Sequence, residues 1–257
     1  MITEKLLRCL IEAKQFLATS IKNPKSTSWL CSVLALIENT MSNCDMGIEK
    51  KDFNLEVVFN SFKKCMREED KDVVLEEYLK AFYELCRFFK LTGPLLGFVA
   101  KDIESKIKSV ERHVHSKKGR HYNTVQSMIQ FEQSKGITHQ KWSPPSGCRM
   151  LLRLHQALEF ILEFMERLRV TEEHEKISVL AWEVYRQTLY HHHPWVTRKL
   201  AQVAVYALPS KKHLIESMCE QDYGTVHGLL TQVVNSGRPV WDTTQLLLAS
   251  HDLLYIP

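Results

Sequence analysis

The chain has 257 residues, of which 44% are hydrophobic and 25% charged, a composition typical of a folded globular protein rather than a disordered chain. Its 34 lysines and arginines exceed its 30 aspartates and glutamates by only four. This excess is too small to indicate a nucleic-acid-binding protein, but it is compatible with an anionic ligand or membrane surface. Only nine glycines and eight prolines occur, and long stretches of high helix propensity predict a mainly helical protein.

Residues 1–50 differ from the rest of the chain and are predicted to form an N-terminal extension of uncertain structure. An amphipathic stretch in residues 5–17 is followed by the polar linker KNPKSTS. A membrane-surface helix fits this pattern, but the stretch also carries acidic residues, and a loosely docked extension is the favoured interpretation. The apolar run Trp29–Ile37 is too short to cross a bilayer.

The seven cysteines are widely spaced, odd in number and without a CxxC pair. Such usage fits reduced, buried thiols better than a disulfide framework. We therefore expect a cytoplasmic protein that associates with membranes only peripherally. A signal anchor within the extension is the less favoured alternative.

From residue 52 onward, hydrophobic spacing and turn residues predict ten helices. They span Leu55–Glu68, Val73–Lys90, Leu95–His113, Tyr122–Ser134, Cys148–Arg169, Glu173–His193, Trp195–Ala207, His213–Cys219, Thr225–Asn235 and Trp241–His251. Prolines and glycines mark the breaks, the last of them at Gly237. Because most connections are short, residues 51–257 are predicted to form a single all-helical domain.

Two charged residues border the apolar face of the third predicted helix. Asp102 and Lys106 lie four residues apart, so their side chains can contact each other or a common third group. On this helix alone, a surface salt bridge beside the core is the simpler interpretation.

The predicted helix Cys148–Arg169 carries Arg149 and Arg153 along its wide apolar arc. Burying a guanidinium group costs several kcal/mol unless an anion compensates it. Asp102 can neutralise only one of the cations Lys106, Arg149 and Arg153, which leaves about two positive charges, the magnitude that a phosphate monoester carries. This balance favours an anionic, phosphate-bearing ligand.

Three adjacent histidines, His191–His193, precede Pro194 and Trp195. Neighbouring residues on a helix point about 100° apart and do not converge on one ion, so no metal site is predicted. His193, beside the proline, is better suited to a single directional hydrogen bond. A satisfied histidine at a helix end is the structural alternative.

Five segments in this order resemble the glycolipid transfer protein family: VFNSFKKC, FVAKDIESKIKSVER, GCRMLLRLHQAL, YHHHPWVTRKLAQVAVYALP and HDLLYIP. The resemblance covers roughly residues 52–257 and is closest to the ceramide-1-phosphate branch. It implies a two-layer, all-helical sandwich that encloses an apolar lipid pocket with a polar headgroup site at its mouth. The headgroup residues that it implies are Asp102, Lys106, Arg149, Arg153 and His193.

The resemblance also implies which headgroup is bound. Sugar-binding relatives carry Asn in place of Lys106 and Trp in place of Arg153, whereas planar cationic donors suit a phosphate. Asp102 would accept hydrogen bonds from the amide and hydroxyl of the sphingoid base, and His193 would donate to the acyl carbonyl. Ester-linked glycerolipids lack that amide N–H.

The sequence thus predicts a monomeric, non-enzymatic transfer protein for ceramide-1-phosphate or a related sphingolipid. It would need no cofactor and bind no nucleic acid, and it would contact membranes transiently, with Trp195 as a candidate anchor. A phosphohydrolase using Asp102 and His193 is less favoured, because no nucleophile elbow, phosphate loop or metal motif occurs. A lipid sensor or helical scaffold that binds the same ligand without transferring it remains the main alternative.

Overall fold

The computed structural model describes residues 53–256, with the exception of residues 68, 70, 93, 143 and 207. The predicted extension, residues 1–50, lies outside the described residues. Within the described ranges the chain forms helices and no β-strand, which confirms the all-helical class. The elements are α3 (Leu55–Cys65), α4 (Leu75–Leu91), α5 (Pro94–Val114), η1 (Gly119–His121), α6 (Val125–Ser134), α7 (Gly147–Val170), α8 (Ile177–Gln187), η2 (Tyr190–His192), α9 (Trp195–Tyr206), α10 (Lys211–Met218) and α11 (Tyr223–Ser250).

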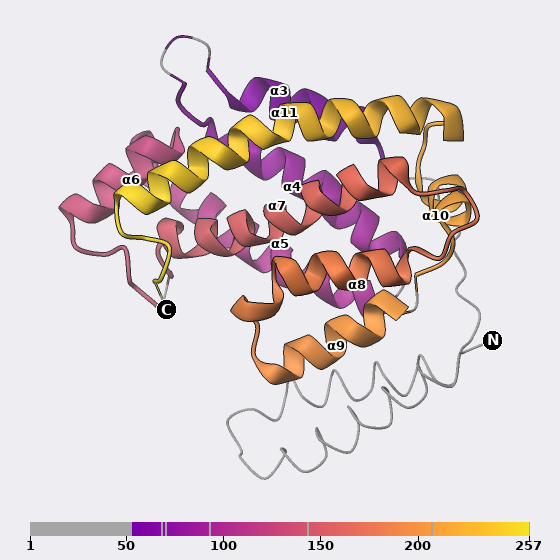
Figure 1. Ribbon diagram of the computed structural model, residues 1–257. Helices are drawn as coiled ribbons and strands as arrows, with labels where there is room; N and C mark the ends of the chain where they lie inside the picture. Colours follow the sequence, from indigo (N-terminus) through magenta and orange to yellow (C-terminus); the bar gives the residue numbers. More distant parts are fainter. Residues whose placement is uncertain are drawn as a thin grey trace.

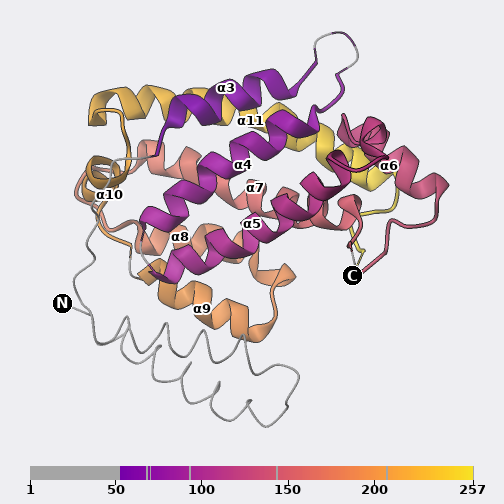
Figure 2. The ribbon, with the colours of Figure 1, turned by 180° about the vertical axis from the view of Figure 1, so that it is seen from behind.

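The long helices form two layers. Helices α3, α4 and α5 pack side by side in one layer, and α11, α7 and α8 form the other (Figure 1). The view from behind brings the first group to the front (Figure 2). Helix α9 packs against both α5 and α8, while α6 and α10 lie toward opposite ends of the molecule. The predicted two-layer helical sandwich is confirmed.

The core is built from the apolar faces of these helices. In α4, for example, Leu75, Tyr78, Phe82 and Leu85 are fully buried and recur at the three- and four-residue spacing of one helix face. The described cysteines are buried and unpaired, as expected: Cys65, Cys86, Cys148 and Cys219. Cys9, Cys31 and Cys44 lie outside the described residues. Among the described helices, none is both long enough and apolar enough to span a bilayer.

Short polar side chains determine where several helices begin. Asn54, Thr124, Ser146, Ser210 and Asp222 are the N-caps of α3, α6, α7, α10 and α11, and each accepts a hydrogen bond from a first-turn amide. These bonds satisfy backbone N–H groups that lack a partner within the helix. The cap at Ser146 fixes the start of α7, the helix that carries Arg149 and Arg153.

The prediction of one helix over Glu173–His193 was wrong. Helix α8 spans only Ile177–Gln187, and the separate 3-10 turn η2 follows it. His193 has an extended backbone, with φ −105° and ψ 140°, because the ring of Pro194 disfavours a helical conformation in the preceding residue. The histidines therefore lie in and after a tight turn and not along a helix.

The predicted break at Gly237 was also wrong, because α11 continues through Gly237 and Pro239. A Cβ atom on Gly237 would lie 2.7 Å from Leu162 Cδ2 and 3.2 Å from Phe62 Cδ2. The glycine thus permits close packing of α11 against α7 and α3. Pro239 removes one N–H from the helix, but the residue four positions earlier, Asn235, is exposed and its carbonyl can bind water.

We expect Gly237→Leu to lower the free energy of unfolding by about 1–3 kcal/mol, because the added side chain meets Leu162 and Phe62. Gly228→Leu is the matched control on the same helix, since a Cβ there has no neighbour within 4 Å. The control should stabilise the protein by up to about 1 kcal/mol through helix propensity. Urea unfolding measures both changes, and equal effects of the two substitutions would contradict this account of Gly237.

Candidate functional site

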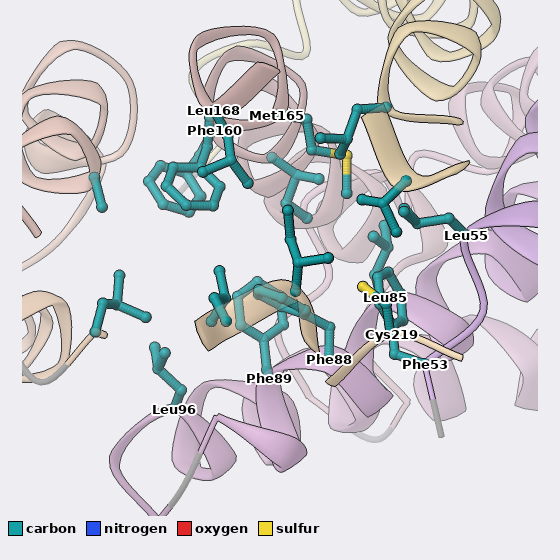
Figure 3. Close-up of a pocket in the computed structure, with 18 of the residues that line it drawn as sticks. Phe53, Leu55, Leu85, Phe88, Phe89, Leu96, Phe160, Met165, Leu168 and Cys219 are labelled. Atoms are coloured by element: carbon teal, nitrogen blue, oxygen red, sulfur yellow. The ribbon is translucent and has the colours of Figure 1, made fainter. Parts of the chain in front are cut away.

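An apolar cavity of about 70 Å³ lies between the two layers. Figure 3 shows Phe88, Phe89 and Leu96 on one side of it and Phe160, Met165 and Leu168 on the other. The remaining lining residues are also apolar: Phe53, Leu55, Leu85, Ile161, Phe164, Ala181, Val205, Leu208, Leu214, Ile215, Cys219, Val226 and Leu230. Pockets that hold small-molecule ligands usually measure about 300–1,000 Å³, so a larger apolar ligand can enter only if the lining side chains move apart.

Asp102 and Lys106 form an ion pair on α5. Asp102 Oδ2 lies 2.5 Å from Lys106 Nζ, and the two side chains are 61% and 20% exposed. The four-residue spacing on one helix brings them together, as predicted. Lys106 is therefore the cation that Asp102 neutralises, while much of the carboxylate remains open to solvent.

Arg149 is positioned by an anchored first turn of α7. The buried Glu132 carboxylate of α6 accepts hydrogen bonds from the backbone N–H groups of Gly147 (2.6 Å) and Cys148 (3.0 Å) and from the Tyr122 hydroxyl (3.0 Å). A carboxylate at a helix N-terminus satisfies the free amides and is favoured by the helix dipole. The direction of the Arg149 side chain thus depends on this buried contact.

Arg149 and Arg153 lie one turn apart on α7, and both are half-buried. Among the described residues, neither forms an ion pair with a carboxylate, and Arg149 Nη1 is buried without a hydrogen-bond acceptor. Arg153 donates to Gln156 Oε1 (3.2 Å) and to the carbonyl of Ile256 (3.5 Å). Burial, and then the charge of Arg149, lower the pKa of Arg153. Within the described part of the chain, these two neighbouring cations therefore lack a compensating anion.

His193 interacts with residues of α5, α7 and α8. Its Nδ1 lies 2.9 Å from the Tyr185 hydroxyl. Burial lowers the pKa of His193 to about 4, while Asp102 raises it and Lys106, His192 and Arg153 lower it further. Since Asp102, Lys106 and Arg153 all act on this imidazole, predicted site residues of α5, α7 and the segment after η2 lie near one another. His193 is accordingly neutral near pH 7.

Trp195, the candidate membrane anchor, lies at the surface. It begins α9, is 44% exposed, and has Lys199 Nζ 5.7 Å from its ring centre. The structure thus brings together Asp102, Lys106, Arg149, Arg153 and His193, and it places Trp195 at the surface nearby in sequence.

The charged site adjoins the apolar cavity through two aromatic rings. Phe160 lines the cavity and makes an edge contact with Tyr185 at 6.5 Å between ring centres. Tyr185 in turn contacts His193. A ligand with a polar head and apolar chains can therefore place its head at the charges and its chains toward the cavity.

Sequence reasoning missed Gln156, Tyr185 and the Ile256 carbonyl as members of the site. The contact of Gln156 with Arg153 could have been predicted from the sequence, because Gln156 lies three residues after Arg153 on the same helix. The contact of Tyr185 with His193 could not have been predicted from spacing, since η2 interrupts the helical register between them. Within the described ranges, no three His, Cys, Asp or Glu side chains are arranged to hold a metal ion.

We expect the stability of the protein to fall as the pH decreases from about 6.5 to 4. Unfolded chains take up a proton on each histidine near pH 6.5, whereas burial lowers the pKa of His193, and also that of His155, to about 4 in the folded state. The unfolded state then binds more protons in this range and is favoured. Urea midpoints at pH 7, 6, 5 and 4 should show the decline.

His193→Gln should make this decline shallower, because it removes one of the two histidines whose pKa falls to about 4 in the folded state. His191→Gln, at an exposed neighbouring histidine, should leave the slope unchanged. An identical slope in wild type and His193→Gln would contradict the assignment of a neutral, buried His193.

The chain is similar to proteins of a known family. The family model described as Glycolipid transfer protein (GLTP) matches residues 73–220. The ceramide-1-phosphate transfer protein of Xenopus laevis is 38% identical over 215 residues, covering 82% of this chain and 100% of the relative. That of Mus musculus is 35% identical over 218 residues, with the same coverage of both chains.

The structure is also similar to solved structures of ceramide-1-phosphate transfer proteins. The mouse ceramide-1-phosphate transfer protein without ligand superposes with a TM-score of 0.75 at 36% identity, over 80% of this chain and 100% of the mouse chain. The human protein in complex with 12:0 ceramide-1-phosphate has a TM-score of 0.73 at 34% identity, with the same coverage.

Proposed function

Because the chain belongs to the glycolipid transfer protein family, we propose that it moves ceramide-1-phosphate, or a related phosphorylated sphingolipid, between membranes without converting it chemically. The observation that carries this proposal is the pair of half-buried arginines, Arg149 and Arg153, that lack a carboxylate partner among the described residues. The names of the similar proteins and the lipid bound to the human structure support the same ligand.

The charge of the site suits a phosphate monoester. Lys106, Arg149 and Arg153 oppose the single carboxylate of Asp102, which leaves two positive charges, and a phosphate monoester carries about −1.5 to −2 at neutral pH. Arginine donates to phosphate oxygens in a bidentate, charge-assisted geometry. In this assignment the buried Nη1 of Arg149 gains the acceptor that it lacks among the described residues.

Asp102 and His193 would recognise the sphingoid part of the lipid. The Asp102 carboxylate is largely exposed beside Lys106 and can accept from the lipid amide and hydroxyl. If the Tyr185 hydroxyl donates to His193 Nδ1, the neutral ring carries its hydrogen on Nε2 and can donate to the acyl carbonyl. These two contacts favour an amide-linked lipid over an ester-linked one.

The hydrocarbon chains would occupy an expanded form of the apolar cavity. Each buried methylene contributes about 0.8 kcal/mol, so the chains supply most of the affinity and the headgroup site supplies selection. Trp195 would rest at the membrane interface, where tryptophan is enriched. The protein would work as a cytoplasmic monomer that visits membrane surfaces.

Blocking the cavity tests whether the chains bind there. We expect Ala181→Phe, in the cavity lining, to slow the transfer of fluorescent ceramide-1-phosphate between vesicles severalfold. Ala249→Phe is the control, because this alanine is exposed on α11. Circular dichroism melts verify that both variants fold. Equal transfer by the two folded variants would exclude this cavity as the chain site.

The same assay separates transfer from the alternatives. A sensor would bind ceramide-1-phosphate tightly at one lipid per chain yet move it slowly between vesicles. A phosphohydrolase would release inorganic phosphate from it. Rapid transfer of intact lipid is the result that the proposed function requires.

A further inference from the structure

A chain of side-chain contacts extends from Arg153 to a second histidine. Gln156 is buried in α7, with 7% of its surface exposed, and its Oε1 accepts from Arg153 Nη1 at 3.2 Å. Its Nε2 lies 3.2 Å from His192 Nδ1 in η2. The Gln156 side chain therefore joins α7, which carries both arginines, to η2.

The chemistry of these groups fixes the hydrogen positions. A guanidinium group only donates, so the oxygen of Gln156 must face Arg153. The amide nitrogen then faces His192, and because an amide nitrogen also only donates, His192 Nδ1 must accept. A neutral imidazole that accepts at Nδ1 carries its hydrogen on Nε2. Arg153 thus determines, through Gln156, which nitrogen of His192 is the donor.

The surroundings of His192 keep the ring neutral and close to the site. Burial lowers its pKa, and the charges of Arg153 and His191 lower it further. A proton on His192 would in turn lower the pKa of His193. Within the described part of the chain, His192 Nε2 makes no hydrogen bond. Its N–H is a free, uncharged donor at the edge of the arginine pair.

The geometry points to His192 as a further headgroup residue, whose Nε2–H donates to a phosphate oxygen, with Gln156 as its positioning residue. This inference rests on the proposed function. A monoester has three terminal oxygens, whereas a phosphodiester has two, so one more donor beside the arginines favours the monoester. Because the donor is neutral, it adds a hydrogen bond without exceeding the charge of the ligand.

Histidine mutations test the contact in the full chain. We expect His192→Ala to weaken equilibrium binding of ceramide-1-phosphate about tenfold, the effect of losing one hydrogen bond to a charged group. His191→Ala is the matched control, because His191 is an exposed neighbour that packs edge-on against Tyr190 and lies outside the Gln156 contact. The control should bind within about twofold of wild type. Equal binding by the two variants would overturn the assignment of His192.

Nitrogen-15 spectra of the imidazole rings test the role of Gln156 independently of lipid. Wild type should show His192 as the Nε2–H tautomer, identified by the signal that His192→Ala removes. The nearly isosteric Gln156→Glu replaces the amide donor with an acceptor, so His192 should gain a hydrogen at Nδ1 and lipid binding should fall. An Nδ1–H tautomer in wild type, or no change in Gln156→Glu, would overturn the positioning role.

These experiments distinguish failure of the proposed function from failure of the inference about His192. Wild-type protein that did not bind ceramide-1-phosphate at all would refute both the proposed function and the headgroup role of His192, whatever the spectra showed. Wild-type binding that His192→Ala left unchanged would refute the inference alone.

Discussion

Arg153→Leu is expected to weaken binding of ceramide-1-phosphate at least about 30-fold, which corresponds to roughly 2 kcal/mol or more for removing one partner of a buried, charge-assisted pair. Leucine preserves much of the apolar contact of the side chain and removes its charge and donors. Arg169→Leu is the control on the same helix, because Arg169 is paired with Glu166 at 2.6 Å. Equilibrium binding to lipid in vesicles measures both variants.

The same substitution should not destabilise the ligand-free protein. Arg153 lies beside Arg149 and, among the described residues, has no carboxylate partner, so its removal relieves repulsion and a desolvation cost. We expect an unchanged or higher midpoint in urea. A variant that lost stability in proportion to its loss of binding would indicate a structural role for Arg153 and contradict the assignment to the headgroup.

Glu132→Ala is expected to lower the free energy of unfolding by about 3 kcal/mol or more. The fully buried carboxylate accepts from two backbone amides at the start of α7 and from the Tyr122 hydroxyl, and alanine leaves these donors buried without an acceptor. Each such donor costs about 1–3 kcal/mol. Thermal and urea unfolding measure the loss.

Glu183→Ala is the control for this prediction, because Glu183 is exposed on α8, and its effect should stay within about 0.5 kcal/mol. A change below about 1 kcal/mol in Glu132→Ala would show that the first turn of α7 is held by other contacts. Ceramide-1-phosphate binding by the folded fraction should also weaken, since Arg149 extends from that turn.

The limits of helix α7 could be predicted from sequence almost to the residue. The prediction of Cys148–Arg169 compares with the observed Gly147–Val170, because a cap signal at Ser146 precedes a strong apolar period. The same periodicity contained an unused signal in α6. One buried face of α6 is formed by Val125, Met128, Ile129 and Glu132. The position of Glu132 on this face could have predicted that its carboxylate is buried.

Other features depend on tertiary contacts that no local pattern reveals. The interpretation of Gly237 as a helix break followed its usual propensity, whereas the structure uses the missing side chain to bring α11 close to Leu162. The contact between Tyr185 and His193 required the 3-10 turn η2, whose position depends on Pro194. Spacing along a helix predicted the Asp102–Lys106 pair, because both residues belong to one regular element.

The measurement that tests the central claim most directly is the initial rate of transfer between vesicles for three lipids. Ceramide-1-phosphate carries both the phosphate and the amide, galactosylceramide carries the amide without the phosphate, and phosphatidic acid carries the phosphate without the amide. We predict rapid transfer of ceramide-1-phosphate and slow transfer of the other two. Faster transfer of galactosylceramide would contradict the assignment of Lys106, Arg149 and Arg153 to a phosphate, and equal transfer of phosphatidic acid would contradict the roles of Asp102 and His193.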